Sequence, residues 1–178
     1  MAAAVGLALK SAGIDAVLTG GACATIYSRG AYLSHDLDFI VRAGATRAKL
    51  DDALASVGFT RDHDRYTHPA TSFFLEFPPG PLSIGGDASI KPAPLRIGRI
   101  TIAALSPTDC CRDRLAAFYH WSDRQSLKSA VEVAVRSRVR MPAIREWSAR
   151  EGASDKFEEF RAQVARRRKP ERNKTAKN

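Results

Sequence analysis

Residues 18–41 read LTGGACATIYSRGAYLSHDLDFIV, and this stretch decides the fold of the chain. The segment 14–19 (IDAVLT) that runs into it is short and apolar, which predicts a strand. Residues 22–29 predict a helix that ends at Gly30. Residues 36–41 (DLDFIV) have the β-branched and aromatic character of a buried strand. The stretch therefore predicts a strand–helix–strand unit with a Gly-Gly pair at its first turn.

Two carboxylates lie two residues apart on the second of these predicted strands. Asp36 and Asp38 therefore project from one face of that strand. Their mutual repulsion raises one pKa unless another group neutralises the charge. A hard divalent cation such as Mg²⁺ is the simplest neutraliser, since it prefers oxygen ligands and takes one or two carboxylates together with substrate phosphates. The alternative is a pair that serves only in a turn or as a helix cap.

The Gly-Gly pair, Gly20 and Gly21, falls at the predicted strand-to-helix turn. Because glycines have no side chain, backbone N–H groups there can approach a phosphate, and the N-terminus of a helix favours an anion. A phosphate cradle beside carboxylates that bind a metal indicates phosphoryl or nucleotidyl transfer.

The Gly-Gly pair followed by the Asp-x-Asp pair, on a strand–helix–strand unit, resembles the signature of the nucleotidyltransferase superfamily, which has the polymerase-β-like fold. The stretch is most similar to the small bacterial branch that includes AbiEii-type toxins. The resemblance covers residues 14–41 well and extends more loosely through the FLEF strand and the helical C-terminal half. It implies an enzyme that moves an NMP group from an NTP to an acceptor hydroxyl and releases pyrophosphate.

The resemblance also implies a role for each residue of the candidate site. Asp36 and Asp38 would bind two Mg²⁺ ions, with Mn²⁺ as the alternative ion. A third carboxylate is expected on a later strand, where Glu76 is the best match. Glu76 would complete the second metal site and help to deprotonate the acceptor hydroxyl. The nucleotide phosphates would be bound by Thr19, Gly20, Gly21, Ser34 and Arg114.

Two of these residues also admit structural interpretations. Glu76 lies inside an apolar strand and calls for a partner or a metal, but it would also suit a strand-end glutamate paired with an arginine. Arg114 matches phosphate oxygens bidentately. Alternatively, two adjacent helices are joined by ion pairs among Asp113, Arg114, Asp123 and Arg124.

Beyond residue 41 the pattern predicts further strands and then only helices. Helices are expected over 2–12, 46–57, 107–120, 123–137, 142–151 and 154–168, strands over 71–77 and 96–103, and a loop over 80–95. Trp121, beside Phe118, is expected in the core rather than stacked on a base.

This order predicts an α+β (or α/β) fold. We expect a minimal nucleotidyltransferase core of about four strands in a mixed sheet flanked by helices, with a helical C-terminal half. The core would occupy residues 1–105, a helical region packed on it 106–168, and a basic disordered tail 169–178.

The basic charge is concentrated at the C-terminal end. The chain has a net charge of +9, and residues 161–178 hold eight Lys or Arg and one Glu, a balance of +7. Such an arm raises affinity for RNA or DNA through phosphate contacts. The alternative is a solvated segment that aids solubility.

Composition excludes several classes of protein. Apolar residues make up 44% and charged residues 26%, which argues against wholesale disorder. No apolar run approaches the roughly 20 residues that span a bilayer, so no membrane partner is expected. The odd set of cysteines, Cys23, Cys110 and Cys111, is typical of a reducing compartment, and we expect a cytoplasmic protein.

The basic tail and the toxin-like resemblance favour RNA, particularly tRNA, as the acceptor. They also favour a toxin of a toxin–antitoxin system with a cognate antitoxin as partner. Two alternatives remain open: a non-catalytic nucleotidyltransferase-fold module that binds RNA or a protein, and a small-molecule transferase of the antibiotic-modifying type.

Overall fold

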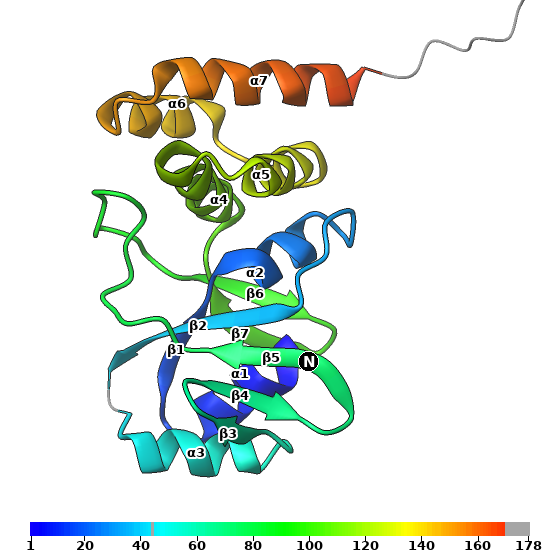
Figure 1. Ribbon diagram of the computed structural model, residues 1–178, viewed down its shortest axis with the longest axis vertical. Coiled ribbons are helices and arrows are strands. Elements are labelled where there is room, and N and C mark those ends of the chain that lie inside the picture. The colour runs from blue at the N-terminus through cyan, green and yellow to red at the C-terminus, as the bar shows by residue number, and fades with distance from the viewer. Residues whose placement is uncertain (44, 170–178) are drawn as a thin grey trace, which may run out of the picture.

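Seven strands form one mixed sheet within the residues that the structure, a computed structural model, describes, namely 1–43 and 45–169 (Figure 1). The strands are β1 (Asp15–Leu18), β2 (Asp36–Ala43), β3 (Thr60–Asp62), β4 (Arg65–His68), β5 (Thr71–Glu76), β6 (Ala93–Ile97) and β7 (Ile100–Ala104). Their order across the sheet is β3-β4-β5-β2-β1-β7-β6. The pairs β2–β5 and β1–β7 are parallel, and the other neighbours are antiparallel.

Three helices lie against the sheet and four follow it. The first three are α1 (Ala2–Ser11), α2 (Gly20–Tyr27) and α3 (Arg47–Ala55), and the others are α4 (Pro107–Trp121), α5 (Arg124–Arg136), α6 (Met141–Arg150) and α7 (Ser154–Arg168). Helices α1 and α3 pack together on one side of the sheet, whereas α2 lies on the other side and joins the sheet to α4 and α5 (Figure 1). The mixed α/β fold with a helical C-terminal half is thus confirmed.

The helical half has apolar residues at helical spacing. In α5 the buried residues Leu127, Ala130 and Ala134 recur on one face of the helix. In α7 Phe157 and Phe160 do the same, and both are almost fully buried. Burial of these faces ties α7 to the folded body. The tail expected at 169–178 falls, apart from Lys169, outside the described residues.

The expectation of about four strands was too low, for two reasons. The alternating segment 96–103 is not one strand. It belongs to a hairpin in which Ile97 pairs with Ile100 and the chain reverses at Gly98, whose φ is +61°. Because the reversal takes only two residues, the alternation continues across it. The strands β3 and β4 are short, with only one buried residue between them, so their pattern is weak.

No described helix combines the length and apolar character needed to cross a membrane.

Candidate active site

Three carboxylates lie on one face of the sheet at the junction of β2 and β5. Leu37 and Phe39 alternate with Asp36 and Asp38 along β2 and are buried on the opposite face. In the parallel pairing with β5, Asp38 lies opposite Glu76. Residues paired across neighbouring strands project to the same side of a sheet. The strand pairing therefore places all three predicted carboxylates together.

The N-terminus of α2 packs directly against two of these carboxylates. Gly20 has a left-handed φ of +65°, and a Cβ atom there would overlap the carboxylate of Asp38. A Cβ atom at Gly21 would overlap the side chain of Ser34 and come within 3.4 Å of Asp36 Oδ1. Only glycine fits both positions. The glycine pair thus brings the first N–H groups of α2 next to the carboxylates.

Thr19 and Ser34 hold the strands around the site. The backbone N–H of Thr19 donates to the carbonyl of Asp38 at 2.9 Å, and its hydroxyl lies 3.4 Å from the same oxygen. The Ser34 hydroxyl donates to the Asp36 carboxylate, while the Ser34 N–H donates to Thr25 Oγ1 at 3.0 Å. Both side chains therefore have partners within the protein, and Ser34 orients the carboxylate of Asp36.

The carboxylates repel one another. Burial, followed by the neighbouring charges of Asp36 and Glu76, raises the pKa of Asp38 to about 6, although Arg114 opposes part of this rise. Half-buried Asp38 is consequently costly to ionise without a nearby cation.

Helix α4 supplies the basic side chain. The Arg114 guanidinium is bound by Asp113, with 3.0 Å from Nε and 2.7 Å from Nη2 to Oδ2, and its side chain is 19% exposed. Burial alone lowers the pKa of Arg114, but Asp113, with smaller effects from Cys110 and Asp38, raises it above its usual value. Arg114 remains a cation beside Asp38, and Asp113, which the sequence interpretation did not assign to the site, orients it.

The alternative of ion pairs among Asp113, Arg114, Asp123 and Arg124 that join two adjacent helices does not match the pairs that these residues form. Asp113 pairs with Arg114 on the same helix, and Asp123 caps α5 by accepting from Gln125 N and Ser126 N. Arg124 pairs with Glu159 of α7. The ion pair of Arg114 therefore lies within α4.

The expectation that Trp121 lies in the core was wrong. Trp121 is the last residue of α4 and its side chain is 77% exposed, whereas Trp147 of α6 is buried. Helical spacing alone does not show where a neighbouring element stops covering a helix.

The donor set fits a metal that arrives with a triphosphate. Among the described residues, no group of three or more His, Cys, Asp or Glu is placed to hold an ion. Mg²⁺, however, takes one or two carboxylates and completes its octahedron with water and phosphate oxygens. Asp36 and Asp38 supply such a pair. Within the described chain the Glu76 side chain makes no hydrogen bond or ion pair, so its carboxylate oxygens are available as well.

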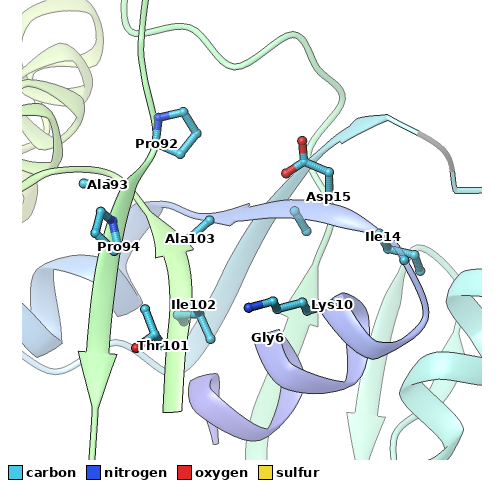
Figure 2. Close-up of a pocket in the computed structure, with 12 residues that line it drawn as sticks. Gly6, Lys10, Ile14, Asp15, Pro92, Ala93, Pro94, Thr101, Ile102 and Ala103 are labelled. Carbon is cyan, nitrogen blue, oxygen red and sulfur yellow. The ribbon is translucent and has the colours of Figure 1, made fainter. Parts of the chain in front are cut away.

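A cavity of about 490 Å³ lies elsewhere, between α1 and the β6–β7 hairpin (Figure 2). Lys10, Asp15 and Ile102 line it, and none of the predicted site residues does. This cavity is separate from the carboxylates.

The strand order and the helical C-terminal half match the fold of nucleotidyltransferase-like proteins of known structure. Among solved structures, the chain is similar to an antigenic nucleotidyltransferase-like protein from Paracoccidioides brasiliensis, with a TM-score of 0.59 and 14% identity over 92% of this chain and 89% of that one. It is also similar to the antibiotic-resistance factor ANT(2'')-Ia, with a TM-score of 0.50 and 14% identity over the same shares. No protein-family model and no curated protein matches the chain. These similarities show the fold, and the AbiEii-type branch stays a prediction.

Proposed function

We propose that the protein is a metal-dependent nucleotidyltransferase that moves an NMP group from an NTP to an acceptor hydroxyl. The observation that carries the proposal is the contact of Gly20 and Gly21 with the carboxylate pair. It combines N–H groups suited to phosphates with oxygen ligands suited to a divalent cation. The nucleotidyltransferase-like fold of the two similar structures supports it.

Each residue of the site has a role in this proposal. The free N–H groups at Gly20 and Gly21 bind the β- and γ-phosphates. Asp36 and Asp38 hold Mg²⁺, for which Mn²⁺ can substitute, and the ion neutralises phosphate charge when bound. Glu76 orients the acceptor hydroxyl and accepts its proton. Arg114 stabilises the charge that develops on pyrophosphate as the bond to the α-phosphorus breaks.

We further propose RNA, tRNA in particular, as the acceptor. The balance of +7 over residues 161–178 supports a polyanionic substrate. A toxin role with a cognate antitoxin is supported only by the sequence resemblance. The similarity to an antibiotic-resistance factor favours a small-molecule acceptor as the second candidate.

Titration calorimetry tests the proposal. The four NTPs are titrated into the protein with Mg²⁺ and again with EDTA. The comparison variants are Asp36→Ala/Asp38→Ala and, as a matched loss of charge on β1, Asp15→Ala. We expect metal-dependent binding of at least one NTP that weakens more than tenfold in the double variant and is unchanged in Asp15→Ala.

A folded wild-type protein that binds none of the four NTPs would contradict the enzyme proposal. That result would favour the non-catalytic binding module instead. NTP binding that is equal with and without Mg²⁺ would remove the metal from the proposal.

A further inference from the structure

The face that carries the three carboxylates continues beyond β5 onto β4. Phe74 lies opposite Asp36 on one side and opposite Thr67 of β4 on the other. Arg65 lies two residues before Thr67 on β4, so it projects from this same face. Its guanidinium carbon is 5.2 Å from the centre of the Phe74 ring.

Arg65 and Phe74 have no evident role in the hydrophobic core. The core residues of β4 and β5 are Tyr66 and Leu75, and both are buried on the opposite face of the sheet. Phe74 is neither in the buried core nor among the partly buried residues that pack against it. Arg65 is 46% exposed, and its ion pair is a long contact of 3.9 Å with Asp62. A half-buried aromatic ring on β5, one strand from Asp36, and a partly exposed cation on β4, two strands from Asp36, thus lie on this face of the sheet.

The spacing suits one nucleotide. Neighbouring strands lie about 4.8 Å apart. A hydroxyl bound between Asp36 and Glu76 and a ring bound over β5 and β4 are therefore about one strand apart. The ribose hydroxyl and the base of a single nucleotide are separated by a similar distance.

We propose that Arg65 and Phe74 form a stacking platform for the terminal base of a single-stranded nucleic-acid acceptor. The statement that this base belongs to the acceptor rests on the proposed function. Phe74 holds the Arg65 guanidinium, whose exposed plane stacks on the base as arginine does in single-strand recognition. Any base offers a ring face, so the platform selects single-stranded ends rather than a particular base.

The charges around the platform predict how it responds to salt. Asp62, Glu76 and Asp36 share this face with Arg65. These carboxylates offset the cation, so the platform attracts phosphates weakly and acts mainly through stacking. Its contribution to affinity should persist at high salt, whereas phosphate contacts of basic residues weaken.

The experiment measures binding of fluorescein-labelled single-stranded oligoribonucleotides by anisotropy, using the full chain at low and high salt, with and without NTP and Mg²⁺. The variants are Arg65→Ala, Arg65→Lys and Phe74→Leu. Arg61→Ala is the matched control, because Arg61 lies on the neighbouring strand β3 but faces the opposite side of the sheet and pairs with Asp51. NTP binding by calorimetry checks that each variant keeps its donor site.

We expect Arg65→Ala and Phe74→Leu to weaken oligoribonucleotide binding about tenfold at both salt concentrations. Arg65→Lys should also weaken it, since lysine keeps the charge but has no plane to stack. NTP binding should be unchanged, and Arg61→Ala should match the wild type. In a transfer assay the same variants should raise the acceptor KM and leave the NTP KM unaltered.

An Arg65→Ala protein that binds oligoribonucleotides as tightly as Arg61→Ala would overturn the platform, as would a wild type that binds none. Failure of the proposed function would be observed separately, as a wild-type protein that binds no NTP. Oligoribonucleotide binding that depends on Arg65 without NTP binding would keep the platform and remove the enzyme.

Discussion

At the scale of single residues, ionising the Asp38 carboxyl costs free energy in the folded protein. Burial, Asp36 and Glu76 together raise its pKa from 3.8 to about 6. Because the folded-state pKa lies above the unfolded value, the stability that Asp38 contributes is fully present below pH 4 and is lost as the pH rises through 6. At neutral pH the metal-free protein therefore carries a strained carboxylate at the centre of the candidate site.

This strain predicts a stabilising substitution. Asp38→Asn removes the charge and keeps the shape, so it should increase the free energy of unfolding at pH 7.5 by about 1–2 kcal/mol. This is less than the full shift implies, because Asp38 is only half-buried. The gain should shrink to nothing near pH 4, where the wild-type carboxyl is itself neutral. Urea denaturation of both proteins across this pH range checks it. A constant difference at all pH values would contradict the assignment.

At the scale of elements, the contact of α2 with β2 depends on the absence of one Cβ atom. Gly20 both adopts a left-handed φ and touches Asp38. Gly30, which follows α2, has a φ of +78° but no heavy atom within 4 Å of where its Cβ would lie. The two glycines share the backbone requirement, and only Gly20 adds the close approach.

Gly30→Ala should therefore lower the free energy of unfolding by about 1 kcal/mol, the cost of a left-handed residue. Gly20→Ala should cost about 3 kcal/mol or more, because Asp38 must also move. It should in addition abolish Mg²⁺-dependent NTP binding, which Gly30→Ala should retain. Urea denaturation and calorimetry measure the two effects. Equal losses in both variants would show that the contact with Asp38 is unimportant.

At the scale of the whole molecule, the segment 78–92 ties the sheet to the helical half. Arg112 of α4 donates to Asp87 of this segment and to Asp109, and its guanidinium lies over the Trp147 ring. The N–H of Gly86 donates to Glu151 Oε1 at 2.9 Å. Hydrogen bonds from Ser89, followed by that from Arg112, hold the pKa of the Asp87 carboxyl well below its usual range.

Asp87→Asn should lower the free energy of unfolding by about 2 kcal/mol at neutral pH, because Arg112 is mostly buried and keeps only Asp109 as a charged partner. A depressed pKa contributes stability above the unfolded value and loses it as the pH falls, so this difference should shrink in acid. Glu146→Gln, which removes an exposed pair with Arg150, should cost almost nothing. If urea denaturation shows the same loss of unfolding free energy for both variants, the contact between Arg112 and Asp87 does not act as a buried ion pair.

Much of the candidate site was predictable because its parts are close in the sequence. The alternation DLDFIV determines which face of β2 carries Asp36 and Asp38, and Gly20 precedes them by one short helix. The role of Glu76 was expected from the family resemblance, which implies a third carboxylate on a later strand, and the alternation of β5 shows only which face of that strand it occupies.

The sequence by itself therefore determined the strand–helix–strand unit, the carboxylate pair and the helical C-terminal half. Only the tertiary structure decided that Asp38 and Glu76 lie opposite each other on neighbouring strands, and that Arg114 binds Asp113 rather than a residue of a second helix. It also decided that Trp121 is exposed and that Arg65 lies over the Phe74 ring. The reason is physical. Periodicity and turn chemistry are set by neighbours along the chain, whereas register, helix coverage and charge pairing depend on which distant segments meet.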